Sequence, residues 1–458
     1  MIHSLNDFNK PFFIGIAGTG MSAIAQYLNG IGKHVSGSDR YFNKNEAEDI
    51  RQKLTNDGIL CFPQDGSGIT PQTDLIVVST AVENTVPEVQ QAIALNIPII
   101  RRSELLAIIT ASRKTIAVGG TSGKSTTSAM LFDILQYAGL EPSIISGAGL
   151  VSIIREGKIG NAKVGKGEWL VIEADESDGS IVQYHAEIGL LLNVDKDHKE
   201  IDVLMEIFKT FQQNSRRFIV NRSHPLAASL SVEPIVDFAV DIAAGAGYTA
   251  TNFHQDGLAI HFSVNGISFS MNTVGRHNME NALAAATTAA MIGVPLHISA
   301  ASIAGYEGIY RRHQVLGTKK GITLIDDYAH NPVKCAASIS ACQPVAKKLI
   351  AWFQPHGYVP TKFLRQDFCD EISKVMREGD EIWMSEIFYA GCTTNKDISA
   401  NDLVNDLKER GNTAYFVGHR NELIDQMRSH FTDNTVLLLM GARDPSLEQF
   451  ANEVWKKL

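Results

Sequence analysis

A glycine-rich stretch, GGTSGKSTT at residues 119–127, combines residue types that proteins use to bind phosphate. Glycines let backbone N–H groups turn toward an anion, and a helix that follows adds its positive N-terminus. Lys124 can reach the β- and γ-phosphates of a nucleotide, and the Ser125 hydroxyl can ligate Mg²⁺. The usual Walker spacing has a glycine where this chain has Val118. The stretch predicts a nucleotide-phosphate site, with a plain glycine-rich turn as the alternative.

Two further groups that could act with this loop follow buried strands. Glu173 ends the apolar run WLVIE, and its carboxylate could hold or orient Mg²⁺. His198, in NVDKDH, follows the apolar run IGLLL. Ligands of open α/β sheets bind at the carboxyl ends of the strands, so we expect Lys124, Glu173 and His198 at one sheet edge. An acidic loop and a structural histidine are the alternatives that these residues leave open.

A second glycine-rich turn lies near the N-terminus. Its pattern G-x-A-G-x-G is formed by Gly15, Ala17, Gly18 and Gly20, between an apolar run and a helical stretch. Asp39 lies about twenty residues further on, as a dinucleotide fingerprint requires, although Ala17 replaces the second glycine of that pattern. These residues predict a nucleotide-binding domain, and a dinucleotide-dependent oxidoreductase is one function that they permit.

The elements that must position these residues follow a regular rhythm. Short apolar runs alternate with helical stretches, which is typical of βαβ units in a mostly parallel sheet. Residues 230–275 differ, because they alternate and contain NG and DG turn signals, which predicts an antiparallel insertion. We therefore expect an α/β protein with three domains, at residues 1–108, 109–316 and 317–458.

Composition excludes several classes of function. The 458-residue chain has a formal net charge of −9 and no stripe of Lys and Arg, which argues against a nucleic-acid partner. Its five cysteines form no CxxC pair and show no zinc spacing. No signal peptide is visible, and no apolar run reaches the ~18 residues that span a bilayer. We expect a soluble cytoplasmic protein that does not bind membranes.

Several stretches together resemble the Mur ligase family over nearly the whole chain, and most of all the branch that joins L-alanine to UDP-N-acetylmuramate. They occur in the family's order: GIAGTGMSAIA, VSGSD, STAVENTVPEV, IPIIRRSELLA, GGTSGKSTT, EADESDGS, NVDKDH, GRHNMENALAA, YRRHQ, DDYAHNP and FQPH. One such motif would carry little weight, whereas so many in order are highly specific.

The resemblance implies a fold and a reaction. The fold is a Rossmann-like UDP-sugar-binding domain, a central P-loop ATP-binding domain and a C-terminal Rossmann-like domain that binds an amino acid. The reaction is the ATP-dependent joining of UDP-N-acetylmuramate, through an acyl phosphate, to an amino acid, with L-alanine as the first candidate. It belongs to peptidoglycan precursor synthesis and uses Mg²⁺. A monomer or a weak homodimer is expected.

Carried over position by position, the resemblance assigns roles in each domain. The expected catalytic residues are Lys124, Glu173, His198 and Arg312, and the expected metal ligands are Ser125, Glu173 and His198. The expected ATP-binding residues are Gly120, Thr121, Ser122, Gly123, Lys124, Ser125, Thr126, Asn278, Arg312, Asp327 and His330. The expected substrate-binding residues are Gly18, Thr19, Gly20, Met21, Ser22, Asp39, Ser79, Ser177, His356 and Arg443.

The last domain departs from the family pattern. In the alanine-adding branch two arginines follow FQPH and hold the carboxylate of the incoming alanine, whereas this chain has Gly357 and Pro360 at those places. It also reads GARDPS where the family reads GAGD, so we expect Arg443 to replace the lost arginines, with Lys362 assisting. A pair between Arg443 and Asp444, or another nearby surface carboxylate, is the alternative.

Other functions stay open from the sequence. A paralogue that takes a different amine or a muramyl-peptide substrate fits the changed last domain. A weakly active, UDP-sugar-binding regulator fits it too, although the retained Lys124 and Glu173 argue against one. An oxidoreductase built on the first domain leaves the phosphate loop without a role.

Overall fold

The computed structural model describes residues 2–44, 46–80, 82–177, 179–195, 199–240, 245–389, 395–444 and 446–458. Its contacts divide the chain into two compact units. Unit 1 comprises Met1–Asn252, Phe262–Ser270 and Met279–Ile309. Unit 2 comprises Phe253–His261, Met271–Asn278 and Tyr310–Leu458. Each unit is described by itself below.

The first sheet of unit 1 is parallel throughout and has the strand order β3-β2-β1-β4-β5. In that order its strands are Leu60–Pro63, Ser36–Asp39, Pro11–Ile14, Leu75–Val78 and Ile99–Arg101. Four helices accompany it: α1 (Thr19–Gly30), α2 (Glu48–Asn56), α3 (Pro87–Ala94) and α4 (Arg102–Ala111). Successive residues of β1 point to opposite faces, so Phe12 packs in a core with α3, while Phe13 packs in a core with α1.

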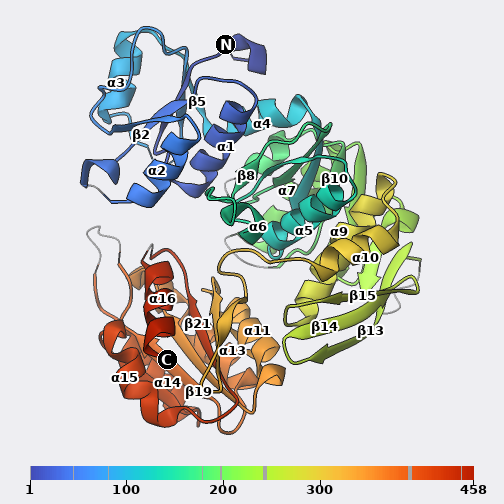
Figure 1. The fold of residues 1–458 in the computed structure, drawn as a ribbon, viewed down its shortest axis with the longest axis vertical. Helices are drawn as coiled ribbons and strands as arrows, with labels where there is room; N and C mark the ends of the chain where they lie inside the picture. The colour runs from blue at the N-terminus through green and yellow to red at the C-terminus, as the bar shows by residue number, and fades with distance from the viewer. Residues whose placement is uncertain are drawn as a thin grey trace. The chain divides into compact units, whose positions relative to one another are not determined.

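The second sheet of unit 1 has the order β11-β10-β6-β9-β7-β8 and is parallel except for its edge strand β8. In that order its strands are Arg217–Val220, Ile188–Leu191, Lys114–Gly119, Trp169–Glu173, Ser143–Ile145 and Ala162–Lys163. The helices of this part are α5 (Lys124–Tyr137), α6 (Val151–Ile154), α7 (Ile201–Gln213), α8 (Pro225–Ala228), α9 (Arg276–Met291) and α10 (Leu296–Ala304). In Figure 1, β10 and α5 are drawn in green, because they follow α1 and precede α9 in the sequence.

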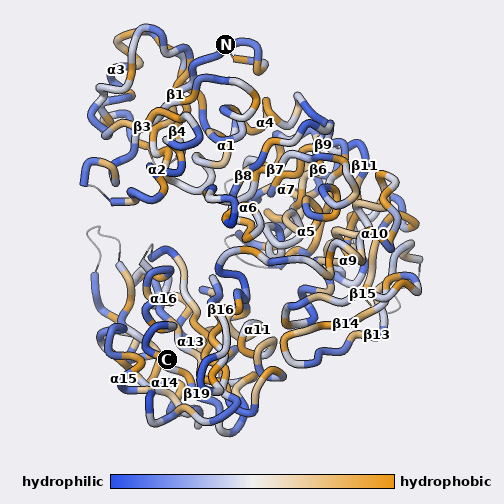
Figure 2. Tube along the Cα trace, viewed as in Figure 1, coloured by the Kyte–Doolittle hydropathy of each residue, from blue (hydrophilic) through white to orange (hydrophobic). Residues whose placement is uncertain are grey.

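One hydrophobic cluster joins these two sheets into one unit. It runs from Phe13 and Leu28 in the first part to Leu170 and Phe208 in the second. Hydrophobic and hydrophilic stretches alternate along the chain (Figure 2), as expected where each element turns one side to a core. No helix among the described residues is both long and apolar enough to span a bilayer.

A small four-stranded sheet follows, with the order β12-β13-β14-β15. Its strands are Phe238–Val240, Tyr248–Asp256, Ala259–Val264 and Ile267–Met271. The last three are consecutive and follow each other through two-residue connections, as the turn signals predict. However, β12 pairs with β13 in parallel, so the prediction of an antiparallel insertion is wrong for that strand. The alternating pattern indicates that one face is buried, but it carries no information on the direction of the neighbouring strand.

The sheet of unit 2 has the order β16-β17-β21-β18-β19-β20, and only the edge strand β16 is antiparallel. In that order its strands are Gln314–Lys319, Ile322–Asp327, Thr435–Gly441, Lys348–Gln354, Glu381–Ser385 and Ala414–Val417. Helices α11 (Pro332–Cys342), α13 (Arg365–Val375) and α14 (Ala400–Glu409) pack in one core, and α15 (Leu423–Met427) and α16 (Leu447–Lys457) pack in another. The short helix α12 covers Tyr358–Phe363.

The predicted α/β class with parallel sheets is confirmed. The predicted limits after residues 108 and 316 fall inside α4 and inside β16. The positions of these limits stay a prediction.

Candidate active site

The predicted phosphate loop lies between the end of β6 and the start of α5. Gly120 and Gly123 have φ angles of +137° and +84°, a region that favours glycine. Gly123 precedes the first turn of α5 and is also held closely, because a Cβ atom there would lie 2.4 Å from Asn281 Oδ1. The loop therefore has the backbone that turns amide groups toward an anion at a helix N-terminus.

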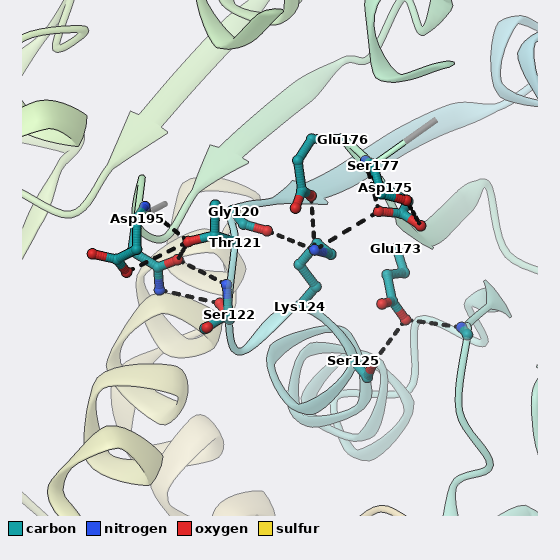
Figure 3. Close-up of polar contacts among 12 residues, drawn as sticks. Gly120, Thr121, Ser122, Lys124, Ser125, Glu173, Asp175, Glu176, Ser177 and Asp195 are labelled. Atoms are coloured by element: carbon teal, nitrogen blue, oxygen red, sulfur yellow. Dashed lines mark hydrogen bonds and ion pairs between the residues drawn. The ribbon is translucent and has the colours of Figure 1, made fainter. Parts of the chain in front are cut away.

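Lys124, the first residue of α5, is mostly buried and interacts with acidic residues (Figure 3). Its Nζ atom lies 2.7 Å from the Gly120 carbonyl oxygen, 2.7 Å from Glu176 Oε2 and 4.0 Å from Asp175 Oδ1. Burial lowers the pKa of Lys124, but Glu176, Glu173 and Asp175 outweigh burial and raise it. The ammonium group is therefore charged at neutral pH.

The partner of Lys124, Glu176, is only 3% exposed. Burial raises the pKa of its carboxyl group, and Lys124 opposes that shift. We treat Glu176 as ionised, because a 2.7 Å contact with a charged ammonium group in a buried site stabilises the carboxylate. A bound phosphate would have to compete with this carboxylate for Lys124, or share the lysine with it.

Glu173 and Ser125 meet as the sequence predicts. Glu173 Oε2 accepts hydrogen bonds from Ser125 Oγ and from the Gly147 backbone N–H, both at 2.8 Å. A side chain at Gly147 would collide with the carboxylate, because a Cβ atom there would lie 2.9 Å from Oε2. A hydroxyl and a carboxylate held side by side are hard oxygen donors that suit Mg²⁺. The third expected ligand, His198, lies outside the described residues.

The opposite side of the loop is held by a residue that the sequence did not single out, Asn193. Its Oδ1 atom accepts hydrogen bonds from Thr121 Oγ1 and from the Ser122 N–H, both at 2.9 Å, and its Nδ2 atom donates to the Ser122 carbonyl. The Asp195 N–H in turn donates to Thr121 Oγ1 at 3.0 Å. The side chain of Thr121 and the backbone of Ser122 thus help to shape the loop.

The remaining expected residues of this part lie nearby on the chain. Thr126 is partly buried in the first turn of α5. The hydroxyl and the N–H of Ser177 both bond to the Asp175 carboxylate, at 2.9 and 3.0 Å. Ser177 therefore shapes the loop after β9 in this structure, and its contact with a substrate stays a prediction.

The glycine-rich turn of the first sheet is fixed by Asp39. This residue ends β2, is 4% exposed, and accepts hydrogen bonds from the N–H groups of Ala17 and Tyr41 at 2.9 and 3.0 Å. Gly15 has a φ of +83° and closes the turn. The expected substrate-binding residues Gly18, Thr19, Gly20, Met21 and Ser22 form the start of α1. Ser79 directly follows β4, at the same edge of the sheet.

Three strands of unit 2 bring expected residues to one edge of its sheet. Asp327 ends β17, His356 follows β18 by two residues, and Arg443 follows β21 by two residues. These strands are parallel neighbours, so their carboxyl ends coincide. This is the edge at which open α/β sheets bind ligands.

Asp327 is buried and ionised. Burial raises its pKa, but His313, Arg312, Ser338 and the His313 N–H together lower it. The His313 N–H donates to Asp327 Oδ1 at 3.1 Å. Asp326, the neighbour of Asp327, forms an ion pair with Arg311, whose Nε atom lies 2.8 Å from Asp326 Oδ2. The expected residue Arg312 is half-buried, with its guanidinium carbon 5.0 Å from the centre of the Tyr328 ring.

The two expected histidines of this edge lie together. The rings of His330 and His356 are 5.6 Å apart. Burial lowers the pKa of His330 to about 4, while its hydrogen bond with the Tyr328 carbonyl opposes the shift. Burial lowers the pKa of His356, and the positive charge of Arg443 adds to that effect. Both rings are therefore neutral at physiological pH.

Asn278, which the resemblance assigns to the adenine of ATP, is 5% exposed. Its Nδ2 atom donates to Thr273 Oγ1 at 3.0 Å and to the Val274 carbonyl at 2.8 Å. Both amide hydrogens are thus used within its own loop, and contact with adenine stays a prediction.

The altered positions of the last domain have unusual backbone conformations. Gly357 has a φ of +73° and precedes α12, and its N–H donates to the Phe388 carbonyl at 2.8 Å. An arginine with this backbone would be strained. Arg443 has a φ of +68°, and its side chain is exposed. Arginine therefore occupies a conformation that glycine adopts more readily.

Asp444, the alternative partner of Arg443, forms an ion pair with another arginine. Asp444 is 5% exposed and pairs with Arg420, while Ser446 donates to its second oxygen. No ion pair of Arg443 is found within the part of the chain that the structure describes. The pairing of Arg443 with Asp444 is therefore wrong. Lys362 forms an ion pair with Asp397 at 2.5 Å, which gives no support to its assisting role.

Three family models match the chain in order. The Mur ligase catalytic domain matches residues 12–114, the Mur ligase middle domain matches residues 118–289, and the Mur ligase glutamate ligase domain matches residues 311–443. The chain belongs to the Mur ligase family. The predicted three-domain organisation is thereby confirmed.

Curated Mur ligases are similar to it over nearly their whole length. The chain is 34% identical to the UDP-N-acetylmuramate–L-alanine ligase of Aquifex aeolicus, over 97% of this chain and 98% of that protein. It is 31% identical to the enzyme of the same name from Agrobacterium fabrum, over 94% of this chain and 93% of that protein.

The fold of solved Mur ligases agrees with this assignment. A crystal structure of UDP-N-acetylmuramate–alanine ligase from Thermotoga maritima superposes with a TM-score of 0.81 at 25% identity and covers 98% of each chain. A murein peptide ligase from Psychrobacter arcticus superposes with a TM-score of 0.67 at 19% identity, over 98% of each chain, and shares the fold.

The Mur ligase motifs singled out side chains that are expected to contact a ligand. They did not single out the side chains that hold the loops in place. Glu176 and Asn193 lie inside the quoted motifs EADESDGS and NVDKDH, yet their partners are about 50 to 70 residues away in the sequence. A signal existed for Glu176, because an acidic residue that closely follows a buried strand and is itself buried needs a partner.

Proposed function

We propose that this Mur ligase is a UDP-N-acetylmuramate–L-alanine ligase that converts ATP to ADP and phosphate as it forms the amide bond. The observation that carries the proposal is the full-length similarity to enzymes of that name, together with the phosphate loop around Lys124. The retained Lys124, Glu173 and Asp327 argue for an active enzyme over a regulator. A cytoplasmic location and a monomer or weak homodimer belong to the same proposal.

ATP would bind with its phosphates on the loop from Gly120 to Ser125. Lys124 supplies a fixed positive charge where negative charge develops on the γ-phosphoryl group. Mg²⁺ would be held by Ser125 and Glu173, with His198 as the expected third contact, and it would neutralise phosphate charge when bound. Asn278, Arg312, Asp327 and His330, the other expected ATP-binding residues, belong to unit 2, and their contact with ATP stays a prediction.

The reaction proceeds in two balanced steps. A carboxylate oxygen of UDP-N-acetylmuramate attacks the γ-phosphorus, a new O–P bond forms, and the bond to ADP breaks. The amine nitrogen of the amino acid then attacks the acyl carbon, loses a proton, and displaces inorganic phosphate. Lys124 matters most in the first step, because negative charge then develops on the γ-phosphoryl group that is transferred.

The first domain is proposed to bind the UDP-sugar. Asp39 supports this over NAD, because its carboxylate already accepts two backbone N–H groups and is only 4% exposed. In a dinucleotide site the equivalent acid would instead accept ribose hydroxyls. The start of α1, from Gly18 to Ser22, offers its positive end to the diphosphate.

Arg443 is proposed to hold the carboxylate of the amino acid. It lies at the ligand-binding edge of its sheet, its guanidinium has no carboxylate partner among the described residues, and it occupies a backbone conformation unfavourable to it. Strain of this kind persists where the residue has a function. An arginine fork binds a carboxylate through two hydrogen bonds.

Release of phosphate from ATP tests this proposal directly. The full chain is incubated with UDP-N-acetylmuramate, Mg²⁺ and single amino acids, with glycine, L-serine and a muramyl peptide among the alternatives. We expect release with L-alanine to exceed that with every other amine. Faster release with another amine would indicate a paralogue that uses that amine, which fits the presence of Gly357 and Pro360 where the alanine-adding branch has arginines. No release with any amine would favour a regulator.

A further inference from the structure

A buried polar junction connects the two sheets of unit 1, which carry the proposed sites for the UDP-sugar and for ATP. Helix α1 of the first part packs closely on β8 of the second. A Cβ atom at Gly30, the last residue of α1, would lie 2.6 Å from Val164 Cγ2, next to β8. The two parts are therefore in direct contact, with no room for an ordered water layer at this point.

Asn161, which directly precedes β8, contacts the start of α1. The residue is fully buried, and its Nδ2 atom donates to the Thr19 carbonyl at 2.8 Å and to Ser22 Oγ at 2.9 Å. Its Oδ1 atom accepts from Gln26 Nε2 at 2.8 Å. A backbone carbonyl can only accept, so the Asn161 amide must turn its NH₂ group toward Thr19.

The backbone of Asn161 connects in the other direction to the phosphate site. Its carbonyl oxygen accepts a hydrogen bond from the Ser146 N–H at 2.9 Å. The next residue, Gly147, donates its N–H to Glu173 Oε2, and that oxygen also accepts from Ser125 Oγ. A short, continuous series of contacts, buried at Asn161 and Ser146 and exposed at Gly147, thus runs from the first turn of α1 to the hydroxyl proposed to hold Mg²⁺.

We propose that Asn161 is a positioning residue that couples the UDP-sugar site to the ATP site. A ligand that draws the first turn of α1 into one position also fixes Asn161, and through Ser146 and Gly147 it fixes the Glu173 carboxylate. Binding at one site then favours binding at the other, by the same factor in both directions. This inference rests on the proposed function.

Calorimetry on the full chain measures the coupling. The Kd of UDP-N-acetylmuramate is determined with and without a saturating, non-hydrolysable ATP analogue and Mg²⁺, and the ratio of the two values is the coupling factor. We expect a factor on the order of ten for the natural chain, within the usual range of such couplings. Asn161→Asp keeps the shape but replaces the donor to Thr19 by an acceptor, and should bring the factor to about one.

Two further variants make the measurement specific. Lys158→Met removes an ion pair with Asp57, which also joins the two parts at 2.6 Å but touches neither loop, and it should keep the natural factor. Gln26→Met removes the hydrogen bond that holds Asn161 Oδ1 and should reduce the factor even if Asn161→Asp does not fold.

The outcomes separate the inference from the function on which it rests. A natural chain that binds neither ligand would overturn the proposed function. A natural chain that binds both ligands without coupling would overturn only the inference. The inference also fails if Asn161→Asp or Gln26→Met keeps the natural factor, or if Lys158→Met loses the coupling as fully as they do.

Discussion

The phosphate loop of unit 1 and the sheet edge of unit 2 both contain residues with a positive φ, but the residue types differ. Both need a backbone with positive φ at the end of a parallel strand. In the phosphate loop glycines supply it, at Gly120 and Gly123. At the edge of unit 2, Gly357 after β18 has a positive φ as well, but after β21 an arginine, Arg443, adopts one.

The difference follows from what each region must recognise. A phosphate is bound by backbone N–H groups, which glycine brings close without a side chain in the way. An amino acid is distinguished by side chains, and these are kept even where the backbone conformation costs about 1 kcal/mol or more. The phosphate loop is thus built without backbone strain, whereas the edge of unit 2 has a strained backbone at Arg443, which places a charged group there.

The largest expected effect concerns the phosphate loop. Lys124→Ala should lower kcat by about 10²-fold or more, because it removes a positive charge from the transferring phosphoryl group. The protein should still fold, since the loop is already formed by Gly120 and Gly123. Steady-state phosphate release measures kcat. Lys114→Ala is the matched control, because this lysine pairs with Glu168 at the opposite end of β6. Near-natural turnover of a folded Lys124→Ala protein would show that the loop is not the ATP site.

The next effect concerns the strained edge. Arg443→Gly should raise the KM for the amino acid about tenfold, since a bidentate charged contact is lost, and leave the KM for ATP unchanged. The same variant should raise the free energy of unfolding by about 1 kcal/mol, because glycine accepts a positive φ without strain. Chemical denaturation and steady-state kinetics measure the two quantities on one sample.

A control for this variant is Lys362→Ala, which removes a cation already paired with Asp397. It should leave the KM for the amino acid unchanged. If Arg443→Gly is more stable but binds the amino acid as well as the natural chain does, the arginine has no role in recognition. The comparison between the two regions would then lose its functional meaning.

A smaller effect is expected at Glu176, which neutralises Lys124 where no phosphate is bound. Glu176→Gln should lower the Kd of a non-hydrolysable ATP analogue several-fold, because the phosphate no longer competes with a buried carboxylate. Titration calorimetry measures the Kd, with the exposed residue Glu168→Gln as a control for net charge. A higher Kd would mean that Glu176 holds Lys124 in position for the nucleotide.

The last effect is on the pH dependence of stability, and its sign differs between the units. Burial raises the pKa of Asp133 in unit 1 to about 7, Glu307 adds to the shift, and Lys163 opposes it. The folded state therefore keeps a proton that the unfolded state loses above pH ~4, so unit 1 becomes less stable as pH rises from about 4 to 7. Burial lowers the pKa of His277 in unit 2 to about 3. The unfolded state then binds the extra proton, so unit 2 gains stability from about pH 3 to 6.5.

Each slope has a limiting value of about 1.4 kcal/mol per pH unit. Asp133→Asn should remove the slope of unit 1 and leave that of unit 2. Hydrogen exchange, corrected for intrinsic rates, measures the opening of α5 and α11 separately at pH 5 and pH 6.5. Equal slopes in both units of the natural chain would contradict this assignment.

Much of this fold could be predicted from sequence. Apolar runs such as that of β6 predicted buried parallel strands, and Lys124 and Glu173 stand at strand ends where the motifs place them. The contacts that shape the site could not be predicted in this way. Asn193 and Asn161 bond to residues about 70 to 140 positions away, and such pairs depend on how sheets are arranged. The antiparallel prediction failed at β12 for another reason, because an alternating pattern carries no information on the direction of the neighbouring strand.

The continuous hydrophobic cluster of unit 1 has a consequence for the construction of chimeric ligases. Because it includes Phe13 and Leu28 as well as Leu170 and Phe208, the first two family domains share one interior. A crossover between them would join halves of two different interiors and leave mismatched packing, which commonly costs several kcal/mol. A crossover near residue 310 leaves this cluster whole, but it separates Phe253–His261 and Met271–Asn278 from the rest of unit 2. A chimera that exchanges the last domain should therefore take these two segments from the same relative as that domain, and keep the first two sheets undivided.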